Sequence, residues 1–152
     1  MTYVSSASEP HGGYFLCSAA AADGETAELV VDRAELTVTL LNRFPYSSGH
    51  LMVAPRRHTP DIPSLTDDEG AAIFAATRRA LRALSAAMGP DGFNVGVNHG
   101  RAAGASVEHF HQHVVPRWDG DTNFMPVVGD VKVLPEHLET TATRLREAFA
   151  AL

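Results

Sequence analysis

The sequence predicts one α+β domain built around an antiparallel sheet. Three observations carry this prediction. Short segments rich in β-formers are joined by Pro, Ser and Gly loops, two longer segments have the apolar spacing of amphipathic helices, and no internal repeat or interdomain linker divides the 152 residues. A chain of this length is large enough to bury a core of its own.

The N-terminal part of the chain predicts an arm and then two strands. Residues 1–25 are rich in Ser, Ala and Gly with no clear period, so a partly ordered arm is expected there, followed by the domain at residues 26–152. Residues 35–41 (ELTVTLL) and 50–55 (HLMVAP) are predicted strands, and the short loop between them indicates an antiparallel pair.

The clearest helix is predicted for residues 64–90. Ser64 or Thr66 can cap its start, acidic residues follow, and Gly89 with Pro90 ends it. Its apolar residues share one face, and its arginines lie mostly elsewhere and are expected to be solvated rather than to bind phosphate; they are Arg78, Arg79 and Arg82.

The C-terminal part adds a third strand, the histidine segment and a second helix. Residues 93–98 (FNVGVN) predict the strand, and a loop of small residues leads from it into the histidine segment. A terminal amphipathic helix is indicated by the apolar residues Leu138, Ala142, Leu145, Phe149 and Leu152.

Composition and charge narrow the class of protein. Hydrophobic residues make up 45% of the chain and charged residues 20%, and the formal net charge is −6. This balance is ordinary for a globular protein and provides no basic field that would recruit nucleic acid or an anionic membrane. The first basic residue is Arg33, so the apolar stretch at residues 14–22 lacks the basic region of a signal sequence. We therefore expect a cytoplasmic protein with no nucleic-acid or membrane partner.

The segment EHFHQHVVPRW, residues 108–118, repeats histidine at every second position. In a strand, His109, His111 and His113 would share one face, with neighbours about 7 Å apart and the outer pair about 13 Å apart. Three incidental histidines on a solvated face are the simplest alternative. Their strict alternation beside a glycine-rich loop instead indicates a site of convergent polar groups.

A metal site fits this spacing poorly. Two imidazoles that reach one zinc ion at about 2.1 Å span only about 11 Å between their Cβ atoms, so a flat strand cannot wrap all three around one ion. Two of them with His50 could, but no carboxylate or cysteine is placed to complete the set. Cys17 is the only cysteine, which excludes an intrachain disulfide and any paired-cysteine site. No metal ligand is therefore assigned.

Phosphoryl chemistry explains three features together: histidine at every second position, the shared face of these histidines, and the adjacent loop of small residues. Neutral imidazole is a good nucleophile near pH 7, and protonated imidazole donates hydrogen bonds to phosphate oxygens. A central His111 can attack phosphorus while its neighbours contact the other oxygens. The loop of small residues would add backbone N–H groups without crowding the anion.

The motif HFHQHVV resembles the signature of the histidine-triad (HIT) family. LNRFPYSSGHLMVAPRRH resembles the family's strand–loop–strand, and FNVGVNHGRAAGAS resembles its phosphate-contact loop. VVPRWDGDTNFMPVVGDVKV is most similar to the bacterial branch of ATP adenylyltransferases or diadenosine tetraphosphate phosphorylases. The resemblance covers roughly residue 36 to the C-terminus.

The resemblance implies a five-stranded antiparallel sheet with two helices, a homodimer whose sheets join, and attack on the α-phosphate of a dinucleoside polyphosphate. By position, His111 would be the nucleophile that forms a nucleotidyl-histidine. His113 would contact the phosphate and leaving group, supported by His109 and His50. No cofactor is required, although Mg²⁺ can arrive with a polyphosphate substrate.

The resemblance also implies substrate-binding residues. Asn42 would lie near the ribose hydroxyls, and it could equally be a turn-former. Asn98 and Ser106 would hold phosphate or leaving-group oxygens, with Gly104 in the same loop, and Ser106 could instead only stabilise that loop.

Two departures keep alternatives open. Gln112 occupies a hydrophobic position of the signature, where burial requires hydrogen-bond partners. The interval from Asn98 to His109 is one residue shorter than in the phosphorylase-like branch and matches hydrolase-like branches. Hydrolysis, phosphorolysis and nucleoside phosphoramidate hydrolysis therefore stay open, as does a non-catalytic nucleotide-binding sensor.

Overall fold

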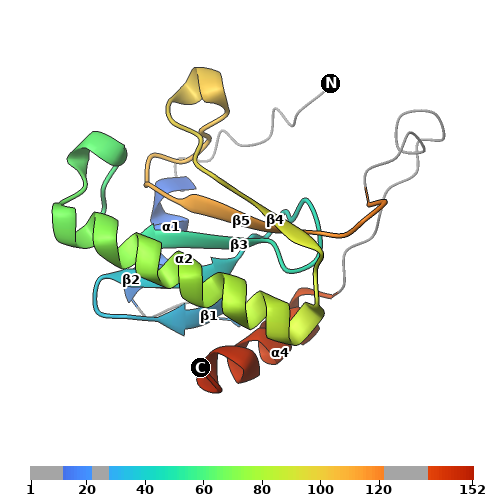
Figure 1. The fold of residues 1–152 in the computed structure, drawn as a ribbon. Coiled ribbons are helices and arrows are strands. Elements are labelled where there is room, and N and C mark those ends of the chain that lie inside the picture. Colours follow the sequence, from blue (N-terminus) through green and yellow to red (C-terminus); the bar gives the residue numbers. More distant parts are fainter. Residues whose placement is uncertain (1–11, 22–27, 122–136) are drawn as a thin grey trace.

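A five-stranded antiparallel sheet forms the centre of the molecule (Figure 1). The computed structural model describes residues 12–21, 28–121 and 137–152. Its strands are β1 (Val30–Arg33), β2 (Thr37–Leu41), β3 (Leu51–Pro55), β4 (Gly92–Gly96) and β5 (Gln112–Arg117), in the order β1-β2-β3-β5-β4. The central strand β3 therefore pairs with its chain neighbour β2 on one side and with the distant β5 on the other.

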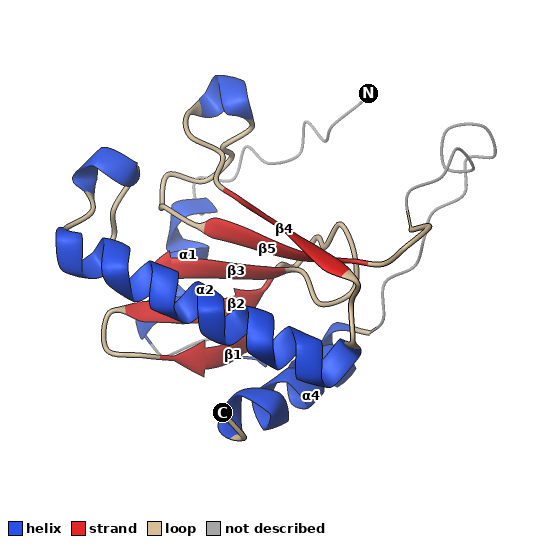
Figure 2. Ribbon diagram, viewed as in Figure 1, coloured by secondary structure: helices blue, strands red, loops and turns tan. Residues whose placement is uncertain are grey.

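Helices cover both faces of the sheet (Figure 2). Two helices, α2 (Asp67–Met88) and α4 (Leu138–Ala150), pack on one face together with Leu51 and Val53 of β3. The other face takes α1 (Gly12–Ala21), and there the side chains of Met52 and Ala54 join its apolar cluster. The alternation of side chains along β3 thus supplies both apolar clusters.

The long helix α2 begins and ends where the sequence predicted. The Thr66 hydroxyl accepts a hydrogen bond from the amide of Glu69, and the Glu69 carboxylate accepts one from the amide of Thr66, which completes a capping box. Gly89 ends the helix in the left-handed conformation, with φ 59°. Ile73 and Leu84 on the predicted apolar face are buried.

Two elements were not predicted, β1 and α1. The apolar residues of α1 are spread around the helix rather than gathered on one face, so they give no helical period. It is nevertheless anchored, because Leu16, Ala19 and Ala20 are buried and Arg33 and Arg56 donate hydrogen bonds to its last carbonyls. The described residues thus form three α-helices, where two were expected, and two short 3₁₀ helices, η2 (Ile62–Ser64) and η3 (Arg101–Ala103). The expected end of the arm, at residue 25, lies outside the described residues.

None of the helices in the described part of the chain combines the length and the apolarity needed to cross a membrane.

Candidate functional site

The histidine segment is only partly a strand, but its side chains alternate between the two faces of the sheet as expected. Phe110, Gln112 and Val114 lie toward α2. His113, which pairs with Met52, lies with His109 on the side of α1, and the ring of His111 meets that of His113. β5 begins at Gln112, so His113 lies in the strand while His109 and His111 precede it. The amide of Phe110 donates to the carbonyl oxygen of Thr59 at 2.6 Å, outside the sheet's ladder. The ring of His109 is buried on the side of α1, where it contacts Cys17.

A chain of hydrogen bonds fixes the protonation of His50 and His113. The backbone N–H of Tyr46 donates to Nδ1 of His50 at 3.2 Å, so this nitrogen carries no hydrogen. His50 therefore donates from Nε2 to Nδ1 of His113, 2.9 Å away. In neutral His113 the hydrogen then lies on Nε2, where it can be donated to a ligand oxygen.

Burial keeps this pair neutral. His50 is completely buried, and desolvation together with the neighbouring His113 and His111 lowers its pKa to about 4. The pKa of His113 is also lowered, mainly by burial and then by His111. Both rings are therefore uncharged near pH 7, as the assigned hydrogen bonds require.

His111 has the opposite tautomer. Its Nδ1 lies 2.8 Å from the carbonyl oxygen of His109, and a carbonyl can only accept, so Nδ1 carries the hydrogen. The lone pair of the neutral ring is then on Nε2. The rings of His111 and His113 meet edge to face, with centroids 5.0 Å apart. A lone pair and an N–H donor are thus presented by neighbouring rings.

A cavity of about 860 Å³ lies beside His113. Asn98, after the end of β4, lines the same cavity and is half-buried. Gly104 has φ 92°, which suits glycine, and Asn98 Nδ2 makes a long hydrogen bond of 3.5 Å to its carbonyl oxygen. Ser106 is exposed in the same loop. The structure thus places Asn98 and His113 at one cavity.

Asn42 has a structural role in the loop between β2 and β3. Its side-chain oxygen accepts the backbone N–H of Phe44 at 2.9 Å, which is an Asx-turn. The amide nitrogen of Asn42 has a separate direction and can still donate to a ligand. A few residues further on, the ring of Tyr46 stacks on His50, with centroids 4.8 Å apart.

Gln112 points to α2 and does not line the cavity beside His113. Its side-chain amide donates to the hydroxyl of Thr77 on α2 at 2.6 Å, and that hydroxyl donates to the carbonyl oxygen of Ile73. The hydrogen-bonding requirement that burial imposes on Gln112 is met by α2.

One grouping of side chains was missed by the sequence analysis. Cys17 Sγ lies 3.3 Å from Nδ1 of His58 and 3.4 Å from Nδ1 of His109, and the three potential ligand atoms all lie within 4.8 Å of one another. Cys17 and His58 are 41 residues apart, so no spacing motif could reveal the group. These are the described residues best placed to hold a metal ion.

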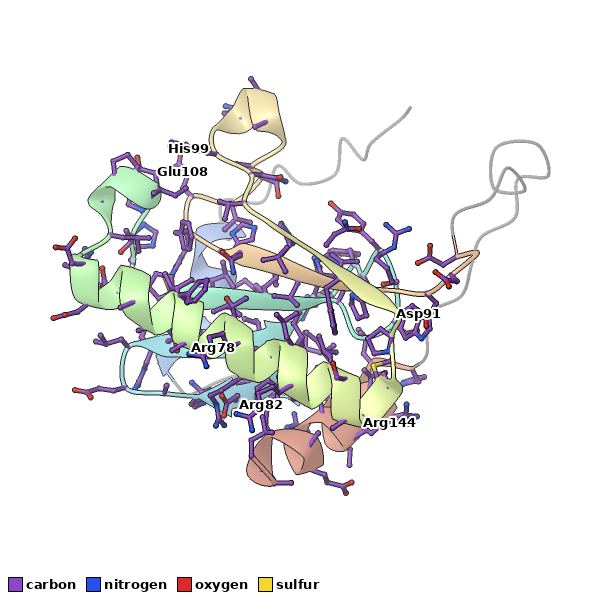
Figure 3. All side chains as sticks on the ribbon, viewed as in Figure 1. Arg78, Arg82, Asp91, His99, Glu108 and Arg144 are labelled. Atoms are coloured by element: carbon purple, nitrogen blue, oxygen red, sulfur yellow. The ribbon has the colours of Figure 1, made fainter. Side chains whose placement is uncertain are left out.

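The arginines of α2 lie away from the histidines. In Figure 3, Arg78 and Arg82 extend from the middle of the helix, far from the loop region marked by His99 and Glu108. Arg79 forms an ion pair with Asp32 of β1. This placement agrees with the prediction that these arginines are not a phosphate patch.

Comparisons with known proteins give the family. Residues 23–120 match the model of the HIT domain. A Mycobacterium tuberculosis protein named AP-4-A phosphorylase is 46% identical over 123 residues, which cover 80% of this chain and 63% of that relative. An uncharacterized HIT-like protein of Methanocaldococcus jannaschii is 33% identical over 72% of this chain and 84% of its own length.

Solved structures agree with this assignment. The crystal structure of a zinc-bound histidine triad family protein from Mycobacterium smegmatis superimposes with a TM-score of 0.74 and 28% identity, covering 89% of this chain and 91% of that one. The family signature, the five-stranded antiparallel sheet and the sequence relatives all point the same way, and the chain belongs to the HIT family.

Proposed function

We propose that this protein cleaves dinucleoside polyphosphates at the α-phosphate through a nucleotidyl intermediate on His111. The observation that carries the proposal is the pair of opposite tautomers. His111 offers an Nε2 lone pair and His113 an Nε2–H, on rings whose centroids are 5.0 Å apart. The similarity to the AP-4-A phosphorylase of Mycobacterium tuberculosis supports the substrate class.

The first step exchanges a P–O bond for a P–N bond. Nε2 of His111 attacks the α-phosphorus, and the bond from phosphorus to the bridging oxygen breaks as that oxygen leaves with the remaining phosphates and the second nucleoside. The Nε2–H of His113 donates to an oxygen at the reacting phosphate and stabilises its charge. The hydrogen bond from Nδ1 of His111 to the His109 carbonyl stabilises the imidazolium-like ring that results.

The second step releases the nucleotide. An oxygen of water or of inorganic phosphate attacks the phosphorus, the P–N bond breaks, and a proton of the attacking group is released. With diadenosine tetraphosphate, the first step yields ATP. Water then gives AMP, whereas inorganic phosphate gives ADP. Imidazoles and backbone amides supply the stabilisation in this scheme, and Mg²⁺ enters with the polyphosphate.

The test is intact-protein mass spectrometry after brief mixing with diadenosine tetraphosphate. We expect a transient adduct of one adenylyl group in the parent protein and none in His111→Ala, with turnover lowered by at least about 10³-fold because the nucleophile is lost.

The matched control is His137→Ala, which removes an exposed histidine at the start of α4. It should keep both the adduct and the turnover. Unchanged turnover in His111→Ala would refute the covalent mechanism. Tight binding without turnover in the parent would make the protein a nucleotide sensor. Nucleotide products formed with and without added phosphate distinguish phosphorolysis from hydrolysis.

A further inference from the structure

The cavity beside His113 continues along the sheet, past the histidines of the proposed reaction. In β5, His113, Val115 and Arg117 are alternate residues that face the same side of the sheet, over a length of about 13 Å. All three line the cavity. The proposed reaction uses only the His113 end, so Val115 and Arg117 have no part in it. We call these two residues the β5 floor.

A loop closes one side of the β5 floor. β3 begins only at Leu51, and the loop before it runs beside the second half of β5 (Figure 1). The Ser47 hydroxyl donates to the carbonyl oxygen of Pro116 at 2.9 Å and holds the loop there. In this loop Tyr46 lines the cavity, stacks on the buried His50 and is 64% exposed. A positioned aromatic ring thus presents surface to the cavity.

The strand β4 supplies a polar group on the other side. Asn94 pairs with Val115 in the ladder between β4 and β5, and it also lines the cavity. Arg117 donates to Oδ1 of Asn94 at 2.9 Å. A guanidinium can only donate, so the oxygen of Asn94 faces Arg117 and its NH₂ group points elsewhere and can donate to a ligand. Because β5 lies between β3 and β4, Tyr46 and Asn94 flank the β5 floor from opposite sides.

The chemistry of the β5 floor fits a flat, uncharged ligand better than an anion. Arg117 makes two hydrogen bonds of 2.7 Å to the carboxylate of Asp121, which offsets the charge of the guanidinium and would repel a phosphate placed beside it. Val115 is apolar and only 8% exposed. An aromatic ring, an apolar surface and an amide donor together are the groups that recognise a nucleobase.

We propose that the β5 floor binds the base of the departing nucleotide. In diadenosine tetraphosphate, phosphates and a ribose separate the broken bond from the second base. The phosphates therefore pass over His113 while the base reaches Val115, stacks against Tyr46 and accepts a hydrogen bond from Asn94. The identity of this ligand rests on the proposed function. The inference adds that the protein holds the half of the substrate that leaves as well as the half that is transferred to His111.

Two substrates with the same adenylyl group and different leaving groups test this role. Attack at the α-phosphate of diadenosine tetraphosphate releases ATP, whereas the same attack on adenosine 5′-tetraphosphate releases triphosphate, which has no base. The ratio of their kcat/KM values measures the contribution of the second nucleoside. The parent should prefer the dinucleotide. Tyr46→Ala should lower that preference at least about fivefold through loss of stacking, and Tyr46→Phe should restore it. Asn94→Ala should lower it about two- to tenfold, as expected for one hydrogen bond.

Phe44→Ala is the matched control. It removes an exposed aromatic ring from the same loop, and Phe44 is not among the described residues that line the cavity. The substrate preference should be that of the parent. A parent without preference, or a Tyr46→Ala variant that keeps it, would overturn the proposal. Equal losses on both substrates in Tyr46→Ala would also overturn it, because they would mean that Tyr46 acts only through His50.

Calorimetry separates this proposal from the proposed reaction. Both compounds are titrated into His111→Ala and into the double variant with Tyr46→Ala, where binding is compared without cleavage. We expect tighter binding of the dinucleotide in the first protein and loss of that difference in the second. This result in a protein whose parent cleaves neither compound would support the role of the β5 floor and refute the reaction. Cleavage through His111 without any binding difference would support the reaction and refute the role of the β5 floor.

Discussion

At the scale of single residues, the protonation of the histidines follows from their partners. His109 donates to the carbonyl oxygen of Pro55, and His111 donates to the carbonyl oxygen of His109. The amide of Tyr46 donates to His50. The three alternating histidines, His109, His111 and His113, therefore differ in which ring nitrogen carries the hydrogen and in what each ring contacts. His109 supports and faces α1, His111 presents a lone pair, and His113 presents a donor.

The buried His50 predicts a pH dependence of stability. The folded protein holds His50 with a pKa of about 4, below the ordinary histidine pKa of 6.5. Between these values the unfolded chain binds a proton that the folded protein does not, so stability falls as the pH is lowered from about 6.5 to about 4. The largest loss from this residue is about 3 kcal/mol, at 1.36 kcal/mol for each pH unit. Urea unfolding at several pH values, in the presence of a chelator, measures the slope.

The variant His50→Asn isolates this contribution. It should be less stable at pH 7 and should depend less on pH over the same interval. His99→Asn, which removes an exposed histidine, should keep the slope of the parent. Parallel slopes in His50→Asn and the parent would show that His50 is not the group responsible.

At the scale of elements, a polar link joins α2 to the strand that carries His113. Gln112 donates to Thr77, which donates to Ile73, and Thr77 is only 5% exposed, so the link is shielded from water. Gln112 lies between His111 and His113 in the chain. The link therefore helps to hold the histidine segment in place relative to α2.

A double-mutant cycle tests this link. Thr77→Val leaves the amide of Gln112 without its partner and should lower the free energy of unfolding by about 1–3 kcal/mol. Adding Gln112→Val removes the orphaned group and should recover most of that loss, since two apolar partners need no hydrogen bond. Thr143→Val on α4 is the control, because its hydroxyl also bonds a carbonyl in the preceding turn but is exposed. Additive effects of the two substitutions would mean that the link has no energetic importance.

Elements with a clear period could be predicted, and those without one could not. α2 combines a capping box, an apolar face and a glycine stop, so its bounds follow from local chemistry. β1 has four residues, and α1 lacks an apolar face, so each is defined by tertiary packing. His111 and His113 were proposed as site residues from their motif, and this remains a prediction. The tautomers and the contact of His109 with Cys17 depend on contacts between distant segments, which no spacing reveals.

At the scale of the whole molecule, the two edges of the sheet differ. Beyond β1, Arg146 of α4 donates hydrogen bonds to the carbonyl oxygens of Glu28 and Val30, so this edge is covered. At the other edge, the β4 residues Asn94, Val95 and Gly96 are exposed. Exposed strand edges tend to pair with other strands, so we propose that the homodimer expected from the family forms through β4.

Sedimentation velocity over a range of concentrations tests this arrangement. The parent should sediment as a dimer, and Val95→Lys should shift it toward the monomer by at least about tenfold in dissociation constant, because a lysine on an edge strand opposes pairing. Phe74→Lys, which replaces an exposed apolar residue of α2, should leave the dimer intact. A monomeric parent, or a dimer that Val95→Lys does not weaken, would exclude β4 as the interface.

The pairing of β3 with β5 also determines when the site comes into existence during folding. His50 and His113 are 63 residues apart in the chain and meet only when these two strands have closed over everything between them. Closure of so long a loop is entropically costly and is expected late in folding. In a nascent or partly folded chain, these hydrogen bonds do not yet determine which ring nitrogen carries the hydrogen. The proposed reactivity would therefore arise only when the native sheet forms.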